Sequence, residues 1–455
     1  MLMGDVRVRK IFEAMFVLEE MREIFRNALP TGLNEEQERA FNEHLERLKQ
    51  VIDELNEGKG VQLKFISDKI ELRTREEEFI NINPIQPGGR LTVDARKALI
   101  AYGDGYSVCD YCLSPFKLER IRRPPIEEFH AELADFVGMD DVRVFPGARR
   151  AFQAVTSALI ERGDVVLVSD IAHYTEFLAV EVAGGVVKEV PSGEHHVVTA
   201  DAVAAKIEEV REENGKLPKL IMIEHFDYSF GNEHDVRGIG KVAKEYGIPF
   251  LYNGAYSVGL LPVNGKEICA DFVVGSGHKG MASAAPSGIL ATTEEWAPVV
   301  FRGSEITGDL TGRKFSAKEP ELLGCTLMGA TIVTMIASFP HVKERVRHWD
   351  EEVKKSNYFI DEFMRIEGCD VVSELPRKHT LSKVDTRGSF DRIARTHKRR
   401  GYFLSDELKR RGIVGEFAGS TKVWKLNTYG LSWDQIKYTA DAFKEIASKY
   451  NLNVR

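Results

Sequence analysis

Two apolar runs, each followed by a polar loop that contains glycine, constrain this chain more than any other feature. The first run, Pro249-Phe-Leu-Tyr252, ends in Asn253-Gly-Ala-Tyr256. The second, Phe272–Val274, ends in Gly-Ser-Gly followed by His278 and Lys279. Short apolar runs bounded by such loops are typical of buried strands. We therefore expect two neighbouring strands in the core of a sheet, with the second loop presenting a single lysine.

This layout is similar to that of fold-type-I enzymes, which use pyridoxal phosphate. In such enzymes a lysine after a strand bonds covalently to the aldehyde of the cofactor. We expect Lys279 to be that lysine. Ser276 and His278, with Gly277 between them, are expected to bind the cofactor phosphate, and Asn253 to reach the pyridine nitrogen. An exposed loop lysine is the alternative, and the Asn-Gly-Ala-Tyr strand end argues against it.

Composition narrows the class of protein. The chain has 455 residues, 43% hydrophobic and 29% charged, which suits a soluble globular protein of two or three domains. No run approaches the roughly 18 apolar residues of a membrane span, and the first residues lack the apolar core of a signal peptide. We expect a cytoplasmic protein with no membrane partner. The net charge of −8 confines nucleic-acid binding to local basic patches, and we expect no DNA partner.

Between residues 126 and 300 apolar strands alternate with helices, which predicts an α/β sheet with helices on both faces and site residues at strand ends. Ala148 and Arg149 follow Gly147 where a strand turns into a helix, so their free N–H groups are suited to a phosphate. An ordinary strand-to-helix turn explains this segment equally well. By analogy with fold-type-I enzymes, His173 should stack on the cofactor ring and Asn232 should lie near its ring oxygen.

The cysteines suggest thiol or metal chemistry. Cys109-x-x-Cys112 lies in a glycine-rich loop, a pattern shared by zinc, redox and iron–sulfur sites. A structural zinc site needs four protein ligands, and the chain has no second Cys-x-x-Cys. Thiol exchange or a cluster of three thiolates fits better. We interpret Cys269 and Cys369 as structural.

Several motifs together resemble one family, the O-phosphoseryl-tRNA:cysteinyl-tRNA synthases. They are Asn81-Ile-Asn-Pro-Ile-Gln, Gly103-Asp-Gly-Tyr-Ser-Val-Cys-Asp-Tyr-Cys112, Gly147-Ala-Arg, Asn253-Gly-Ala-Tyr, Gly275-Ser-Gly-His-Lys and Glu321-Leu-Leu-Gly-Cys-Thr. The resemblance extends from about Phe79 to the C-terminus. Cysteine desulfurases share the Ser-Gly-His-Lys motif but not the set of three cysteines.

The resemblance implies an activity and a set of partners. Such enzymes convert phosphoserine attached to the cysteine tRNA into cysteine, by eliminating phosphate and adding sulfur. It implies pyridoxal phosphate on Lys279 and three essential cysteines, Cys109, Cys112 and Cys325, which hold either a persulfide or an iron–sulfur cluster. Lys279 and His173 complete the expected catalytic set. It further implies a homodimer that associates with phosphoseryl-tRNA synthetase and with a bridging helical protein.

The expected fold is a mixed seven-stranded sheet with helices on both faces, a smaller C-terminal α/β domain and an N-terminal helical extension. Residues 1–75 combine a heptad-like seam, typical of an antiparallel helical hairpin, with alternation typical of a short β-hairpin. We expect a large cofactor-binding domain over residues 76–340 and a small domain over 341–455. Whether residues 1–75 dock a partner or cover their own protein stays open.

Segment 387–411 is strongly basic, with nine Lys or Arg and three Asp or Glu. A solvated helix face usually explains such a run, but in an acidic protein it is also a candidate patch for RNA phosphates. Two other functions are compatible with the chain. It could be a desulfurase that acts on free cysteine, or a scaffold that tethers tRNA and partner enzymes through residues 1–75.

Overall fold

The computed structural model describes residues 3–26, 32–56, 79–85, 88–102, 107–108, 123–316, 318–322 and 327–455. Three of the expected site residues, Cys109, Cys112 and Cys325, lie outside these ranges, as does the expected β-hairpin of the N-terminal extension. The chain divides into two compact units, Met1–Arg75 and Glu76–Arg455. Within the described residues, no helix has the length and hydropathy needed to span a membrane.

The N-terminal unit contains two helices, α1 (Met3–Arg26) and α2 (Glu35–Asn56). The Phe25 and Phe41 rings meet edge to face with centroids 5.2 Å apart, while Arg47 of α2 forms an ion pair with Glu13 of α1. Because residues late in α1 contact residues early in α2, and the reverse, the helices run antiparallel. Asn34 caps α2 by accepting N–H bonds from the first helical turn.

The centre of the second unit is a seven-stranded sheet with the strand order β3-β9-β8-β7-β6-β4-β5. Its strands are β3 (Asp141–Phe145), β4 (Val165–Ser169), β5 (Val186–Val190), β6 (Leu220–Glu224), β7 (Phe250–Asn253), β8 (Phe272–Ser276) and β9 (Gly288–Thr292). Strands β4 to β8 are mutually parallel, and β9 runs antiparallel to both β8 and β3. The expected mixed sheet of seven strands is therefore confirmed.

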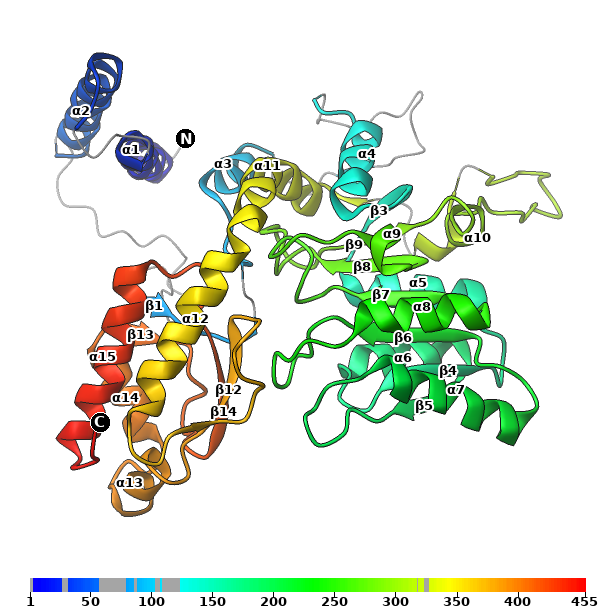
Figure 1. The fold of residues 1–455 in the computed structure, drawn as a ribbon. Coiled ribbons are helices and arrows are strands. Elements are labelled where there is room, and N and C mark those ends of the chain that lie inside the picture. Colours follow the sequence, from blue (N-terminus) through cyan, green and yellow to red (C-terminus); the bar gives the residue numbers. More distant parts are fainter. Residues whose placement is uncertain are drawn as a thin grey trace. The chain divides into compact units, whose positions relative to one another are not determined.

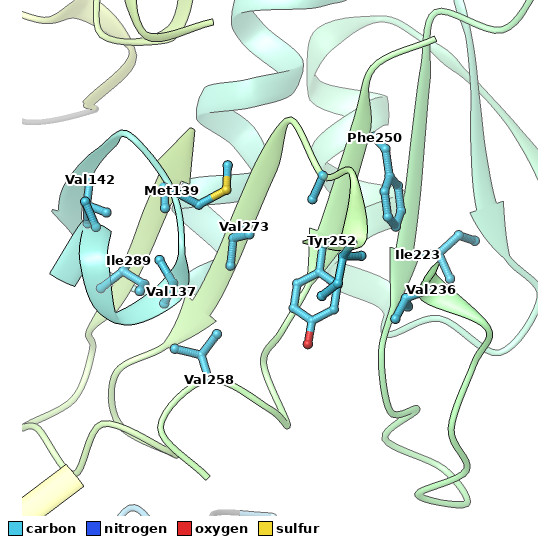
Figure 2. Close-up of a cluster of buried hydrophobic side chains, with 14 of the residues drawn as sticks. Val137, Met139, Val142, Ile223, Val236, Phe250, Tyr252, Val258, Val273 and Ile289 are labelled. Carbon is cyan, nitrogen blue, oxygen red and sulfur yellow. The ribbon is translucent and has the colours of Figure 1, made fainter. Parts of the chain in front are cut away.

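Each face of this sheet carries its own hydrophobic core, because alternate residues of a strand point to opposite sides. Ile221 and Tyr252 face α7 (Ala200–Asn214) and α8 (Val236–Tyr246). Met222 and Leu251 face α5 (Ala148–Leu159) and α6 (Tyr174–Ala183). Figure 1 shows these helix pairs on opposite sides of the sheet. Figure 2 shows the first core, where Tyr252, Val273 and Ile289 come from adjacent strands.

A smaller sheet of three strands, β11-β12-β14, packs with helices in the C-terminal region. Its elements are β11 (Asp370–Val371), β12 (Leu381–Asp385), β14 (Val423–Asn427), α12 (Trp349–Met364), α13 (Phe390–Thr396), α14 (Tyr402–Arg410) and α15 (Trp433–Lys449). A second, short pairing joins β1 (Ile80–Asn81) to β13 (Ile413–Val414) in parallel, and Ile82 is fully buried in the C-terminal core. The segment after residue 79 thus packs with the small domain, although sequence position assigns it to the large one.

The remaining elements connect these parts. They are α3 (Val93–Tyr102), β2 (Ser107–Val108), α4 (Ile126–Val137), α9 (Gly265–Ile268), α10 (Ala297–Val300), β10 (Leu327–Met328), α11 (Gly329–Arg345) and two 3-10 turns at Pro320–Leu322 and Val346–His348. Helix α11 contributes Ile332, Met335 and Phe339 to the large core, and it continues past the expected domain boundary at residue 340.

Candidate active site

The candidate site lies where strands β6, β7 and β8 end at the same edge of the sheet. These strands are parallel, with Glu224 in register with Asn253 and Asn253 in register with Val274. Side chains that pack toward α5 and α6 stand two residues before Glu224, Asn253 and Ser276. Alternation therefore places all three polar side chains on the α5/α6 face. Such an edge is where ligands bind in open α/β sheets.

Lys279 begins the loop beyond β8 and has the properties of a reactive amine. Its Nζ lies 3.8 Å from the centroid of the Tyr256 ring, and no carboxylate of the described residues forms an ion pair with it. Burial lowers the pKa of Lys279 to about 7, with a further contribution from the positive charge of Lys425. Close to neutral pH, a large fraction of this lysine is therefore an uncharged nucleophile.

The loop around Lys279 meets the N-terminus of α5. Ser276 pairs with Gly288 of β9, and a Cβ on Gly288 would lie only 2.6 Å from the backbone nitrogen of Ala148. The first helical N–H groups have no partner within the helix, and α5 has no side-chain cap. Ala148, Arg149 and Ser276 are thus brought to one place, which offers several donors to an anion.

Gly277 and His278 belong to the same cradle. A Cβ on Gly277 would lie 2.5 Å from Ser287 Oγ, so the close approach of these two loops requires glycine. The Nδ1 atom of the half-buried His278 lies 3.1 Å from the carbonyl oxygen of Ser287. Burial lowers the pKa of His278, which leaves a neutral ring beside the loop.

Asn253 is held in one orientation by two hydrogen bonds. Its Oδ1 accepts the N–H of Ala255 at 3.0 Å, and its Nδ2 donates to Glu176 Oε2 at 3.0 Å. One N–H of the amide is left to donate to a ligand. Glu176 of α6 is fully buried, and its pKa is raised well above the usual range, by burial first and then by the nearby Glu224. Burial and the nearby Glu224 thus both favour the neutral form of Glu176.

His173 caps α6, since its side chain accepts the N–H of Thr175. Its ring centroid lies 4.9 Å from that of Tyr228 in an edge-on arrangement. The pKa of His173 is lowered to about 4, by burial first and then by the charges of Lys279 and Lys425. The ring is thus neutral at pH 7 and lies within electrostatic range of the reactive lysine.

The side chain of Asn232 has several hydrogen-bond partners within the protein. Its amide is fully buried and engaged elsewhere: Nδ2 donates to the carbonyl of His195 at 3.2 Å, and Oδ1 accepts the N–H of Glu374 and an Arg377 N–H. With these partners the side chain holds the turn after β6 against the small domain. Its expected place near the ring oxygen of the cofactor stays a prediction. The sequence does not indicate these hydrogen bonds, because Glu374 and Arg377 lie far from Asn232 along the chain.

The thiols divide into two sets. Cys109, Cys112 and Cys325 lie outside the described residues, so their convergence remains a prediction. Cys369 is buried beside Ser389, with its sulfur 3.0 Å from the hydroxyl oxygen, and burial raises its pKa to about 12. Cys269 ends α9 in a left-handed backbone conformation with φ of 58°. The described residues contain no group of His, Cys, Asp and Glu suited to a metal ion.

The basic segment 387–411 is largely self-neutralised. Five of its nine cationic residues form ion pairs with carboxylates: Arg387, Arg395, Arg399, Arg410 and Arg411. Arg400 is exposed and lines a groove of about 430 Å³ together with Arg395 and Lys422. Lys398 and Arg400 are not among these five, so they carry part of the positive charge that no carboxylate compensates.

The residues that the sequence predictions missed come from outside the lysine loop. Tyr256 covers Lys279, Glu176 fixes Asn253, and Lys425 of β14 lowers the pKa of Lys279. Tyr256 stands in the Asn-Gly-Ala-Tyr strand end, so its motif already pointed to the site. Glu176 gave a weaker signal, an acidic residue in the first turn after His173. For Lys425, strand alternation was the only feature of the sequence that could have indicated a role in the site.

These residues fit pyridoxal phosphate. An amine with a lowered pKa and no counter-ion within the described part of the chain is suited to the cofactor aldehyde, and the donors at the start of α5 and the end of β8 are suited to its phosphate. The remaining N–H of Asn253 is suited to a ring nitrogen that accepts a hydrogen bond. Neutral His173 is suited to stacking on the ring.

Comparison with known proteins agrees with this chemistry. A family model described as O-phosphoseryl-tRNA(Sec) selenium transferase, SepSecS, matches residues 154–446. The chain is 65% identical to O-phospho-L-seryl-tRNA:Cys-tRNA synthase 1 of Methanococcoides burtonii over 447 residues, 98% of this chain and 97% of the relative. It is 63% identical to O-phospho-L-seryl-tRNA:Cys-tRNA synthase 2 of Methanoregula boonei over 451 residues, 99% of each chain.

Solved structures give the same picture. A crystal structure of a SepCysS–SepCysE N-terminal domain complex matches with a TM-score of 0.76 at 44% identity, covering 86% of this chain and all of that chain. A cysteine desulfurase from Thermococcus onnurineus NA1 matches with a TM-score of 0.65 at 18% identity, covering 82% and 96%. The latter likeness concerns the fold alone and, with the mixed sheet, confirms the fold-type-I architecture. The chain therefore belongs to the family of O-phospho-L-seryl-tRNA:Cys-tRNA synthases.

Proposed function

We propose that this protein converts O-phosphoseryl-tRNA(Cys) into cysteinyl-tRNA(Cys) in a reaction that depends on pyridoxal phosphate, with elimination of phosphate and addition of sulfur. The observation that carries the proposal is Lys279, an amine with a pKa near 7 at the edge of a fold-type-I sheet. Near-full-length relatives of the same name support it. The reaction takes place in the cytoplasm, where aminoacyl-tRNA is used.

Different residues of the site would hold different parts of the cofactor. Lys279 is the attachment point, and Ser276, Gly277, His278 and the N-terminus of α5 receive the phosphate. When bound, pyridoxal phosphate withdraws electrons from the substrate Cα. Asn253 would hold the ring nitrogen through its remaining neutral N–H and would not keep that nitrogen protonated, because its carbonyl oxygen already accepts the N–H of Ala255. This weaker electron withdrawal suffices, since phosphate is a good leaving group.

Lys279 then acts as the base. When it is not bonded to the cofactor, Lys279 Nζ would take the proton from Cα of the phosphoseryl group. The electron pair forms the Cα–Cβ double bond, the Cβ–O bond breaks, and the phosphate carries away that bond's electrons. A sulfur nucleophile next adds to Cβ, and Lys279 returns the proton to Cα. Where this nucleophile is the outer sulfur of a persulfide, a second thiol breaks the S–S bond and releases the cysteinyl thiol, which leaves a disulfide that an external thiol reduces. His173 stays neutral throughout, which suits stacking rather than charge stabilisation.

The sulfur comes by way of Cys109, Cys112 and Cys325. A persulfide needs an attacking thiolate and a resolving thiol within contact distance, whereas an iron–sulfur cluster needs three thiolates that converge on one point. Both require Cys325 to lie beside the loop that carries Cys109 and Cys112. Strand β2, just before that loop, pairs with β10, just after Cys325, within one chain. In a homodimer with active sites at the subunit interface, the loop and Cys325 would therefore both come from the partner of the chain that supplies Lys279.

The partners follow from the same proposal. The substrate is cysteine tRNA carrying phosphoserine, and the exposed cations of segment 387–411 contact its backbone. The helices of residues 1–75 serve the association with phosphoseryl-tRNA synthetase and a bridging helical protein. A relative of known structure was crystallised with the SepCysE N-terminal domain, which supports a helical partner.

Substitution of the cysteines tests the proposal. Serine at 109, 112 or 325 should abolish sulfur transfer to phosphoseryl-tRNA and leave the cofactor absorbance intact. The matched controls, Cys269→Ser and Cys369→Ser, should keep their activity. Iron, sulfide and cofactor analysis after anaerobic purification separates a persulfide from a cluster. Turnover of free cysteine but not of phosphoseryl-tRNA would identify a desulfurase, and the lack of any cofactor band would favour the scaffold.

A mixed dimer tests whether the site is shared between chains. Lys279→Ala and Cys325→Ser homodimers should each be inactive, while mixing the two subunits should recover part of the activity. Because one of the two sites in the mixed dimer then holds both functional residues, about half of its sites should work. Full activity of the Cys325→Ser homodimer would contradict the three-thiol site.

A further inference from the structure

Two lysines stand directly opposite one another in the small sheet. Lys383 of β12 is in register with Lys425 of β14 in an antiparallel ladder, so both side chains leave the same face. The other face directs Val384, Trp424 and Leu426 into the C-terminal core. Like charges directly opposite in a sheet are destabilising. The pair therefore weakens the fold unless an anion offsets its charge.

Among the described residues, no anionic group contacts either lysine directly. Lys425 Nζ donates to the carbonyl oxygen of Tyr228 at 2.8 Å, and Lys383 Nζ donates to Ser229 Oγ at 3.2 Å. Lys383 Nζ also lies 3.9 Å from the centroid of the Phe230 ring. Throughout the part of the chain that the structure describes, no carboxylate forms an ion pair with either lysine. Their contacts are thus neutral dipoles and ring faces.

The nearest relevant carboxylate is already engaged. Asp227 acts electrostatically on both lysines, but its oxygens accept the backbone N–H groups of Ser229 at 2.7 Å and Asn232 at 2.8 Å. Burial lowers the pKa of Lys383, and burial together with Lys383 lowers the pKa of Lys425. The positive charge of the two lysines on this face therefore exceeds the negative charge near them. Because the face is partly shielded from water, an anion would bind there strongly.

Lys425 also faces the reacting end of the site. Its charge contributes to the lowered pKa values of both Lys279 and His173. Its Nζ lies 4.9 Å from the centroid of the Tyr228 ring, and that ring packs against His173. The cradle proposed for the cofactor phosphate comes instead from α5 and the end of β8. The lysine pair is thus a second cationic place, on another element.

We propose that Lys383 and Lys425 form the subsite for the phosphate of the phosphoseryl group, a dianionic phosphate monoester. This rests on the proposed function and refines it. The phosphate is bonded to Cβ, next to the Cα whose proton Lys279 takes, so it must lie close to Lys279 Nζ. Two ammonium groups match the two charges of the monoester. The same subsite holds inorganic phosphate after the Cβ–O bond breaks.

Thermal unfolding in inorganic phosphate tests the subsite without turnover. The cofactor-loaded protein is used, so that the cofactor's own phosphate site is filled. Phosphate should raise the melting temperature of the wild type and have little effect on Lys425→Met. Lys422→Met is the matched control, since Lys422 is exposed just before β14, and it should respond like the wild type. An equal shift in wild type and Lys425→Met would overturn the proposal.

Binding of three tRNAs separates the two sources of phosphate. The wild type should bind phosphoseryl-tRNA about 10- to 100-fold more tightly than seryl-tRNA, the effect of a charged hydrogen-bonded contact. Lys425→Met should lose most of this preference, Lys425→Arg should restore part of it, and uncharged tRNA should bind all variants equally. If uncharged tRNA weakens by the same factor, the lysines hold a backbone phosphate and the proposal is wrong.

The outcomes also distinguish this proposal from the proposed function. A phosphate-dependent shift that requires Lys425, found in a protein that does not turn over phosphoseryl-tRNA, would keep the subsite and reject the function. Turnover of phosphoseryl-tRNA with an unchanged Michaelis constant in Lys425→Met would keep the function and reject the subsite. Because Lys425 also lowers the pKa of Lys279, a Lys425→Met protein that loses cofactor absorbance is replaced by Lys383→Met in the same measurements.

Discussion

The cationic residues of this protein fall into two regions that handle charge in opposite ways. In segment 387–411 most cations are exposed and are paired with carboxylates, as Arg399 is with Asp406. Lys279, Lys383 and Lys425 are half-buried, and none of them has an ion pair among the described residues. Exposed pairs contribute little, with a median of about 0–1 kcal/mol, whereas partly desolvated cations are costly. The comparison shows that pairing and burial, rather than the density of Lys and Arg, locate an anion site.

The largest effect is expected at Lys279. Lys279→Ala should lower turnover of phosphoseryl-tRNA by at least about 10³-fold, since it removes both the covalent attachment and the base. The absorbance band of the lysine-bound cofactor should disappear with it. Lys266→Ala is the control, because Lys266 is an exposed lysine paired with Asp140. A band that survives Lys279→Ala would move the attachment to another amine.

The lowered pKa of Lys279 also predicts a pH dependence of stability. In the cofactor-free protein this pKa is about 7, with Lys425 as the facing charge, and in the unfolded chain it is about 10.4. Between these values the unfolded state binds more protons, so the contribution of Lys279 to stability rises with pH. Lys279→Met should therefore stabilise the apoprotein on the order of 4 kcal/mol more at pH 6 than at pH 10. Urea unfolding at both pH values measures this, and equal effects would show that the amine is not desolvated.

An intermediate effect is expected at Glu176. Because burial favours the neutral form of this acid, Glu176→Gln should preserve the bond to Asn253 and change cofactor affinity less than about threefold. Glu176→Ala leaves the Asn253 amide without this partner and should cost about 1–3 kcal/mol of stability. Chemical unfolding and cofactor titration at pH 7 compare the two variants. A large loss in Glu176→Gln would indicate that the site requires a carboxylate anion.

The smallest effect is expected in the basic segment. Neutralising Lys398 and Arg400 together should weaken tRNA binding a few-fold and lower the salt dependence by about one to two units of slope. Arg399→Gln should change little, because Arg399 is already paired with Asp406. Affinities measured between low and moderate salt test both statements. An unchanged slope in the double variant would show that these cations are only solvated.

Much of the site was predictable because its determinants are local. The run into Asn253 and the run into Ser276 and Lys279 specify strands by their apolar residues and their ends by glycine. Alternation within each strand then decides the face from which a polar side chain leaves. The sheet of seven strands, the lysine loop and the turn into α5 follow from these short-range rules and from the family resemblance.

Other features depended on which distant segments pair, which local rules do not encode. Asn232 looks like a cofactor ligand in its loop, but Glu374 and Arg377 occupy its amide. Ile82 belongs by position to the large domain, but β1 pairs with β13 and buries it in the small one.

The sequence by itself determined the class of chemistry, since a strand that ends in Ser-Gly-His-Lys and a second that ends in asparagine carry their own geometry. Only the tertiary structure decided which residues surround each charged side chain. Lys383 and Lys425 lie far apart in the chain, and no periodicity marks them as neighbours. The register of β12 on β14 sets them side by side. Burial against the turn after β6 then separates them from any counter-ion, because charge state and solvation are properties of packing rather than of sequence.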